Sequence, residues 1–319
     1  MIEDAGTIVG RFSSTAMPGK MLVNAFPSLK HVPDWFPGTG WKQYLKEGAD
    51  INKRLVSPPW RDAKVKLNNI PENEQLHSVA KGLIENLGPE TDPGYDEKFK
   101  IAMNVAAQSY TAGANTTYCA TGAIFAALLT HPEVQRKAQA AIDAVTGGDR
   151  LPIPADIDDI PYLEALVKEV TRWFTVSPLG VPHLSSEDEE FNGYFIPKGT
   201  LLMANSWAIL HDPEVFQNPH EFRPERYLKD GKIDPTVLDP DLTAFGFGRR
   251  ICPGRYIGKV ILKFTVASVL SVFDIVPAKD ANGNDIAPVL EQSTEVITSL
   301  KPYQCDVKPR SAKHAALLA

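Results

Sequence analysis

Hydrophobic positions repeat along most of this chain with the spacing of a helix. Residues 96–129 are apolar on nearly every side, which is typical of a long helix buried all round. Residues 132–146 carry a single apolar stripe, and a further amphipathic stretch begins at Pro161 and reaches Phe174. Another apolar helix is predicted after Cys252, ending near residue 273. These patterns predict a mainly helical chain.

Other segments carry the signals of turns and short strands. The dipeptides Asn192–Gly193 and Asn282–Gly283 predict two hairpins, because both residue types adopt positive φ easily. Residues 211–240 contain five prolines, which exclude a regular helix or an inner strand there. Residues 1–95 predict short helices broken by proline and aromatic clusters, notably at 25–38. The expected fold class is mainly α with minor β.

Length, composition and charge describe a folded globular body. The 319 residues are 43% hydrophobic and 23% charged, which is enough for one large or two ordinary domains. The net charge is -6 and both signs are mixed along the chain, so we expect no nucleic-acid partner. No apolar run reaches the roughly 18 residues of a membrane span, and the first residues do not resemble a signal peptide. We therefore expect no anchor in these residues and leave a cytoplasmic location open.

The three cysteines, Cys119, Cys252 and Cys305, are too few and too far apart for a disulfide framework. This usage favours a reducing compartment. A cysteine with a special environment is then a reactive thiol or a ligand. Cys119 and Cys305 have no motif around them, and we expect both to be inert.

Cys252 stands within the stretch FGFGRRICPGRY, residues 245–256. The pattern FxxGxRxCxG fits without a mismatch, its specified positions being Phe245, Gly248, Arg250, Cys252 and Gly254. Glycines allow a tight turn and a close approach to a flat ligand, where a Cβ would clash. A helix start and neighbouring arginines favour thiolate over thiol, and a thiolate is the form that binds metal. The alternative is an inert cysteine in a loop before a helix.

Two further stretches carry spacings of interest. Glu169 and Arg172 in EVTR are three apart on a predicted helix, and Arg226 follows in FRPERY. The pair alone is most simply a solvated ion pair. In AGANTT, a glycine weakens the long helix and the hydroxyl of Thr116 can bond the carbonyl of Ala112, which favours a bend.

These motifs, in this order, resemble the cytochrome P450 family, in wording closest to its fungal microsomal members. The resemblance covers residues 1–310 and implies the C-terminal two-thirds of the cytochrome P450 fold. The implied parts are a long central helix, the ExxR helix, a proline-rich meander, the cysteine loop and short β-hairpins. We expect a single domain over 1–319, with substrate-roof helices and loops at 1–95 and a haem-binding core at 96–319. No tryptophan is followed four residues later by arginine, so we expect an upstream part of the family's domain to be missing.

The resemblance implies roles for individual residues. Cys252 is the axial ligand of the iron of haem b (iron protoporphyrin IX), and Arg250 pairs with a haem propionate. His183 is a second propionate partner, with an ordinary surface or core histidine as an equal alternative. Phe245, Gly248, Gly254, Ala112 and Gly113 belong to the cofactor site by the same resemblance.

On the oxygen-binding side, the resemblance makes Thr116 and Asn115 the catalytic residues. The family usually has an acid where this chain has Asn115, and an amide cannot donate and recover a proton as a carboxyl does. Slow turnover with reductant lost to peroxide is therefore expected.

Two other groups of residues follow from the resemblance. Glu169, Arg172 and Arg226 form a structural network that holds the cysteine loop in place. The segments that line the substrate pocket contain Val176, Leu179, Val181 and Ile297.

The implied function is a haem-thiolate monooxygenase that inserts one oxygen atom from O2 into an apolar substrate, in secondary metabolism or xenobiotic oxidation. Electrons come from NADPH through a flavoprotein reductase. Full-length relatives sit on the cytoplasmic face of the endoplasmic reticulum membrane, and residues 25–38 resemble loops that dip into it, with a packed surface loop as the alternative. Two other functions stay open: a non-catalytic remnant that binds haem weakly or not at all, and a member that rearranges peroxides or dehydrates without O2.

Overall fold

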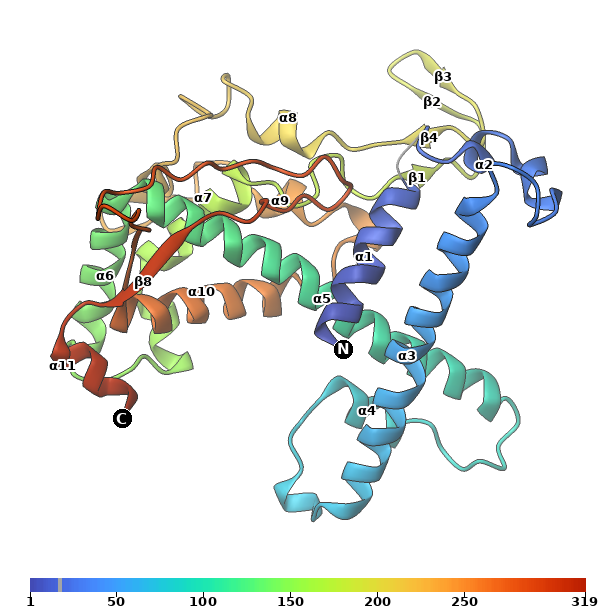
Figure 1. The fold of residues 1–319 in the computed structure, drawn as a ribbon, viewed down its shortest axis with the longest axis horizontal. Helices are drawn as coiled ribbons and strands as arrows, with labels where there is room; N and C mark the ends of the chain where they lie inside the picture. The colour runs from blue at the N-terminus through green and yellow to red at the C-terminus, as the bar shows by residue number, and fades with distance from the viewer. Residues whose placement is uncertain (17–18) are drawn as a thin grey trace. The chain divides into compact units, whose positions relative to one another are not determined.

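The computed structural model describes residues 1–16 and 19–319, which form two compact units (Figure 1). Unit 1 comprises Met1–Thr116 and unit 2 comprises Thr117–Ala319. The expectation of one domain with a boundary near residue 95 stays a prediction.

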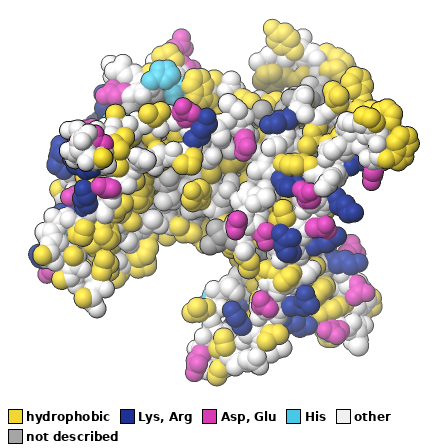
Figure 2. Space-filling view, in the orientation of Figure 1, with side chains coloured by type: hydrophobic (Ala, Val, Ile, Leu, Met, Phe, Trp, Pro, Cys, Tyr) yellow, Lys and Arg dark blue, Asp and Glu magenta, His cyan; other side chains and the backbone are white. Residues whose placement is uncertain are grey.

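Unit 1 contains helices and connecting loops, and no strand among its described residues. Its elements are α1 (Ile2–Ala16), α2 (Leu22–Ala25), the 3-10 turns η1 (Pro27–His31) and η2 (Glu72–Glu74), α3 (Gly40–Asn69), α4 (Val79–Glu85) and the first part of α5 (Tyr95–Thr130). A small core joins α3 and α5, centred on Trp60, Leu87 and Ala102. Charged side chains of both signs are interspersed along α3 (Figure 2).

The expectation of short helices broken by proline is wrong for α3. This helix runs for 30 residues with Pro58 and Pro59 inside it. A proline in a helix removes one hydrogen bond and crowds the preceding turn. Leu55 and Trp60, on either side of the prolines, are only 2% and 3% exposed, so packing of the flanking turns keeps the helix together. The segment 25–38 is irregular as predicted, and its Phe26, Trp35 and Phe36 side chains are exposed.

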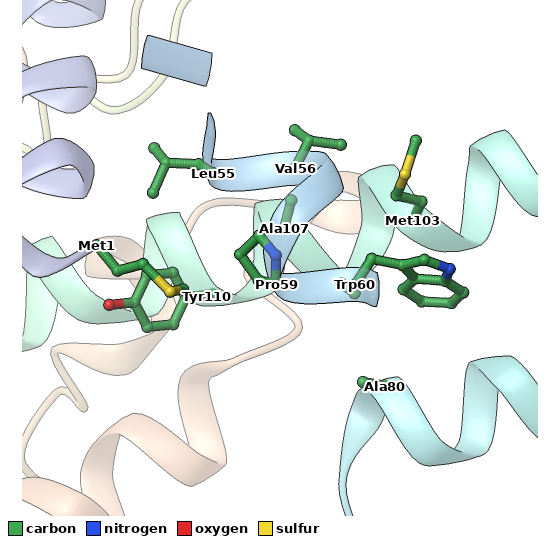
Figure 3. A pocket seen from close by; sticks show the side chains of 10 residues that line it. Met1, Leu55, Val56, Pro59, Trp60, Ala80, Met103, Ala107 and Tyr110 are labelled. Carbon is green, nitrogen blue, oxygen red and sulfur yellow. The ribbon is translucent and has the colours of Figure 1, made fainter. Parts of the chain in front are cut away.

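A cavity of about 170 Å³ lies inside unit 1, among α3, α4 and α5 (Figure 3). Its wall is almost entirely apolar and includes Leu55, Trp60, Met103 and Tyr110. The residues that the sequence assigns to a substrate pocket do not line it. Its position is therefore no support for that assignment.

Unit 2 holds the remaining helices and the strands. Its helical elements are the end of α5, α6 (Pro132–Thr146), η3 (Pro154–Asp159), α7 (Pro161–Trp173), α8 (Ser206–Leu210), η4 (Pro224–Tyr227), α9 (Asp241–Ala244), η5 (Gly248–Arg250), α10 (Arg255–Val272), α11 (Ala312–Ala315) and η6 (Ala316–Leu318). Helix α6 ends at Gly147, whose φ of 74° gives the left-handed C-cap that the glycine predicts. The predicted helices at 132–146, at 161–174 and after Cys252 are confirmed.

The strands of unit 2 form four separate antiparallel pairs. These are β1 (His183–Leu184) with β4 (Leu201–Leu202), β2 (Glu189–Phe191) with β3 (Tyr194–Ile196), β5 (Leu228–Lys229) with β6 (Lys232–Ile233), and β7 (Phe273–Pro277) with β8 (Cys305–Pro309). Asn192 and Gly193 join β2 to β3 with φ of 50° and 80°, as the first hairpin signal predicts. The second signal is also correct, since Gly283 turns the chain at φ 84° beside the bridge between Lys279 and Asp285. The fold class, mainly α with minor β, is confirmed.

The core of unit 2 packs the end of α5 against α6, α7 and α10. Its fully buried side chains include Ile124, Ile142, Leu166 and Val266. The expectation that α5 is buried all round is correct for Cys119–Leu129, where most side chains are inaccessible. It is wrong for residues 96–118, where most side chains are exposed or half-buried. A helix that is apolar on every side needs neighbours on every side, and each unit supplies only some of them.

Among the described residues, no helix combines the length and the hydropathy that a membrane crossing requires.

Candidate functional site

The loop that carries Cys252 connects two helices of unit 2 through a tight glycine turn. It begins after α9 and ends at the first residue of α10. The backbone N–H of Cys252 donates to the carbonyl of Phe245 at 2.8 Å, which closes the loop. Gly246 and Gly248 have φ of 79° and 55°, a region that side chains with a Cβ rarely adopt. The loop sequence thus requires glycine at these two positions for backbone reasons alone.

The sulfur of Cys252 lies at the start of α10. Gly254 caps this 18-residue helix, so the cysteine precedes its first turn. The carbonyl of Cys252 accepts from the Arg255 guanidinium at 3.2 Å. Pro253 lies between Cys252 and the capping glycine, before the first turn of α10.

Gly254 differs from the other two glycines. Its φ of -83° is ordinary, so its backbone does not require glycine. A Cβ at this position would lie 3.8 Å from the sulfur of Cys252, in van der Waals contact. A side chain here would occupy space beside the sulfur.

The three cysteines have different surroundings. Cys119 is 4% exposed, and burial raises the pKa of its thiol to about 11. Burial also raises the pKa of the Cys305 thiol. Both side chains therefore stay protonated near neutral pH, in agreement with the expectation that they are inert. Cys252 is half-buried at a helix start.

Glu169 and Arg172 form a fully buried ion pair on α7, so the solvated alternative is wrong. Both side chains are 0% exposed. The Arg172 guanidinium donates two hydrogen bonds of 2.9 Å each to the Glu169 carboxylate. Its remaining donors reach backbone carbonyls of Leu210 at 3.1 Å, Pro219 at 2.6 Å and Glu221 at 3.2 Å. All five N–H groups of the guanidinium are thereby engaged.

Arg226 completes this network from η4. Its Nε donates to Glu169 at 3.0 Å, and the backbone N–H of Arg223 donates to the same carboxylate at 2.8 Å. The other guanidinium nitrogens of Arg226 reach carbonyls of the preceding loop, including Gln217 at 2.9 Å. We call Glu169, Arg172 and Arg226 the arginine network. The hydrogen bonds that its side chains make to other described residues go to positions 210–223, which precede the cysteine loop by a long stretch of chain.

Sequence reasoning missed the backbone part of this arrangement. The N–H of Arg223 and the accepting carbonyls belong to an irregular segment, where side-chain periodicity carries no information. The prolines of that segment were the available signal for such contacts. They prevent regular backbone hydrogen bonding, so the carbonyls of the segment need donors from elsewhere.

Thr116 and its neighbours lie in unit 1, at its boundary with unit 2. The hydroxyl of Thr116 donates to the carbonyl of Ala112 at 2.8 Å, as the sequence predicts. Gly113 is exposed and Asn115 is half-buried, and α5 continues through all of them as α-helix. Their role in oxygen chemistry stays a prediction.

The structure joins two of the predicted pocket segments. The backbone N–H of Thr298 donates to the carbonyl of Val176 at 2.7 Å, which brings Ile297 next to the segment after α7. Leu179 and Val181 are 43% and 60% exposed in unit 2.

The two basic residues predicted for haem propionates both lie at the surface. His183 is exposed on β1, and Arg250 is exposed in η5.

A family model described as cytochrome P450 matches residues 86–307. The chain belongs to the cytochrome P450 family. The match includes the long helix α5, the arginine network and the Cys252 loop, so the three motifs fall inside one family domain.

Several cytochrome P450 relatives from fungi are similar over almost the whole chain. Cytochrome P450 monooxygenase COX1 of Coprinopsis cinerea is 47% identical over 319 residues, which is 100% of this chain and 61% of that protein. Cytochrome P450 monooxygenase claR of Ampulloclitocybe clavipes is 40% identical over 314 residues, 98% of this chain and 56% of that protein. Tryptamine 4-monooxygenase of Psilocybe cyanescens is 40% identical over 304 residues, 94% of this chain and 58% of that protein. The chain thus spans less than two thirds of the length of these relatives.

The residues around Cys252 fit a haem held through sulfur. The sulfur is half-buried, and it precedes a long helix whose N-terminal dipole favours a negatively charged atom. Residue 254 is glycine, so no Cβ at that position occupies the space beside the sulfur. The apolar side chains of Phe247, in the loop, and Ile257, in the first turn of α10, are 49% and 65% exposed. A thiolate next to apolar surface is the donor set that a haem-thiolate site requires.

Proposed function

We propose that this chain carries the haem-binding part of a monooxygenase in which Cys252 is the axial ligand of haem b. The observation that carries the proposal is the half-buried sulfur in a glycine turn at the start of α10. The burial that raises the pKa of Cys119 and Cys305 makes either of them a poor thiolate donor.

The chain's own residues act mainly by positioning. The bond from the Cys252 N–H to Phe245 fixes the direction in which the cysteine leaves the backbone. The start of α10 places the sulfur at the positive end of the helix dipole. Arg250 and His183, whose side chains are both exposed, would pair with the propionates of the cofactor. When bound, the haem supplies the redox chemistry of O2, which a thiolate ligand directs toward O–O cleavage.

On α5, Thr116 and Asn115 handle protons for that chemistry. The Thr116 hydroxyl already donates to the Ala112 carbonyl, which leaves its oxygen lone pairs to accept from a water molecule. Asn115 can orient water but cannot release a proton, so proton delivery would be slow and reductant would be lost as peroxide.

The partners follow from the same assignment. One oxygen atom would enter an apolar substrate, in a pocket lined by Val176, Leu179, Val181 and Ile297. Two electrons come from NADPH through a flavoprotein reductase. The exposed aromatic side chains of residues 25–38 touch the cytoplasmic face of the endoplasmic reticulum membrane, and hydrophobic side chains gather over this segment in Figure 2.

The test is haem binding by the 319-residue protein and its single cysteine variants. Each protein is reconstituted with haem, reduced and exposed to carbon monoxide, and its absorption spectrum is recorded. We expect the parent protein, Cys119→Ser and Cys305→Ser to give the Soret band of thiolate-ligated iron. Cys252→Ser is expected to lose that band while keeping the helical circular dichroism of the parent.

Two results contradict the proposal, and each points to an alternative. A thiolate-type band that survives Cys252→Ser assigns the ligand elsewhere. Failure of the folded parent to take up haem supports the non-catalytic remnant. Turnover without NADPH or O2 would instead favour peroxide rearrangement or dehydration.

A further inference from the structure

The ends of the Cys252 loop are joined by an ion pair that no motif includes. Asp241 is the first residue of α9, before the loop, and Lys259 lies in α10, after it. The Lys259 ammonium donates to the Asp241 carboxylate across 18 residues of sequence. The two side chains are only 19% and 14% exposed.

We expect this pair to contribute more to the stability of the fold than a surface ion pair does. The second carboxylate oxygen of Asp241 is buried and has no hydrogen-bond partner among the residues that the structure describes. Lys259 therefore provides the main compensation for a buried negative charge. A buried charge that loses its partner is strongly unfavourable, whereas exposed pairs contribute little.

Neighbouring charges connect the pair to α7. Lys168 on α7 donates to Asp239 at 2.6 Å, and Asp239 in turn accepts from the backbone N–H of Asp241 at 3.1 Å. One helical turn beyond Lys259, Lys263 contacts Glu164 of α7 at 3.0 Å. The segment before the loop and the helix after it are thus both fixed to one helix.

The arginine network does not make these connections. Within the described residues, its side-chain hydrogen bonds to residues outside the network go to the earlier part of the irregular segment, at 210–223. The residues on either side of the cysteine loop are held by lysines and aspartates.

We propose that Asp241 and Lys259 are positioning residues, a clamp that holds the two ends of the Cys252 loop at the separation that presents the sulfur to its ligand. The contact itself is the ion pair between Asp241 and Lys259. Its role in presenting the sulfur rests on the proposed function. The clamp acts through the backbone of the loop and touches neither cofactor nor substrate.

The first test follows the reactivity of the Cys252 thiol in the protein without haem. In a Cys119→Ser/Cys305→Ser background Cys252 is the remaining thiol, and its rate of alkylation by iodoacetamide reports opening of the loop. Lys259→Met and Asp241→Asn are each expected to raise this rate about tenfold, because either one leaves a buried group uncompensated and favours local opening. Lys259→Arg keeps the ion pair, and its alkylation rate is expected to stay within about threefold of that of the parent.

Charge alone predicts a different result. Removing a nearby cation would make the thiolate less stable and slow alkylation, and removing a nearby anion would speed it. A clamp requires that both substitutions accelerate the reaction. Lys263→Met is the matched control, since Lys263 is a buried lysine of the same helix that contacts Glu164 and not the segment before the loop. It is expected to lower thermal stability without changing the alkylation rate.

The second test uses the haem-loaded protein. In the reduced, carbon monoxide-bound protein, part of the absorption is expected to move from the thiolate-type Soret band to the band of iron that has lost its thiolate. This fraction is expected to be several-fold larger for Lys259→Met than for Lys263→Met. If Lys259→Met does not fold, Asp241→Asn carries the same measurements, with the same faster alkylation expected.

Opposite rate changes in Lys259→Met and Asp241→Asn would overturn the clamp, as would rates equal to that of Lys263→Met. Failure of the parent protein to show a thiolate band would count against the proposed function. The alkylation rates would still decide the clamp.

Discussion

Helix α7 carries two charge systems on neighbouring sides, and they are built differently. The arginine network has side-chain exposures of 0% for Glu169 and Arg172 and 5% for Arg226. The lysine contacts on the other side are more open, since Glu164 is 23% and Asp239 is 41% exposed. The first system binds irregular backbone, and the second connects one helix to another and to the start of the cysteine loop.

The difference follows from the shape of the two cations. A guanidinium presents five donors in a plane, so it can satisfy several carbonyls of a chain that has no regular hydrogen bonding. An ammonium is a compact charge on a flexible stem, which suits a contact between side chains of two helices. We infer that the arginine network organises the irregular segment after α8, and that the lysine contacts join α7 to α10 and to the segment before the cysteine loop. That the arginine network holds the cysteine loop in place stays a prediction.

The largest effect is expected from Glu169→Gln. The substitution keeps the shape of the side chain but leaves Arg172 and Arg226 buried without a countercharge. Losing one partner of a buried ion pair costs about 3–5 kcal/mol, and this carboxylate serves two arginines. Urea unfolding is expected to show at least that loss in the free energy of unfolding, or a chain that does not fold.

Glu291→Gln is the matched control for that measurement. Glu291 pairs with Lys301 at 2.6 Å, but its side chain is 57% exposed, so little or no change in the free energy of unfolding is expected. Equal effects of the two substitutions would mean that the arginine network is not the stronger system.

Arg226→Lys is expected to have the next largest effect. Lysine keeps the charge but cannot hold Glu169 and the carbonyl of Gln217 with one planar group. We expect a loss of about 1.5–3 kcal/mol, the range for hydrogen bonds to charged groups. A substitution with no measurable cost would show that charge, and not the planar fork, is what this position needs.

Lys263→Met is expected to cost less, about 1–2 kcal/mol. Lys263 is buried, but its partners Glu164 and Asp158 have side chains that are 23% and 90% exposed, so solvent compensates their charges in part. Thermal or urea unfolding measures the change. A loss as large as that of Glu169→Gln would remove the distinction between the two sides of α7.

The smallest effect is expected from Asp156→Asn, and it depends on pH. The hydrogen bond from Arg150, aided by the backbone N–H of Ile153, lowers the pKa of Asp156 from 3.8 to about 2. Because the folded protein binds the proton more weakly than the unfolded chain, this stabilisation is present above pH 3.8 and is lost as the pH falls toward 2. Asp156→Asn and Arg150→Met should each flatten the pH dependence of unfolding in that range. An unchanged slope in both variants would contradict the assignment.

Regular elements were predictable because their signals are local. The stripe at 161–174, the glycine stop at 147 and the Asn192–Gly193 turn each depend on residues within a few positions of one another, and each is correct. Helix α3 was missed because Pro58 and Pro59 are local signals against a helix, while the buried Leu55 and Trp60 that outweigh them act through tertiary packing. The burial of α5 was overestimated for the same reason, since its neighbours are set by the whole fold.

The residues of the candidate site also differ in whether local sequence signals predict them. Cys252, Glu169, Arg172 and Arg226 stand in motifs that can be read from short stretches. Asp241 and Lys259 are a common residue pair 18 positions apart, with no repeat or motif that singles them out. Only the return of the chain after the cysteine loop brings them together.

The central claim is that the sulfur of Cys252 binds the haem iron, and X-ray absorption at the iron edge tests it most directly. The haem-reconstituted protein is expected to show one sulfur neighbour of iron in addition to the four porphyrin nitrogens. Cys252→His should replace that sulfur by a nitrogen, while Cys119→Ser should keep it. A sulfur neighbour that persists in Cys252→His, or its absence from the folded and haem-loaded parent, would contradict the account.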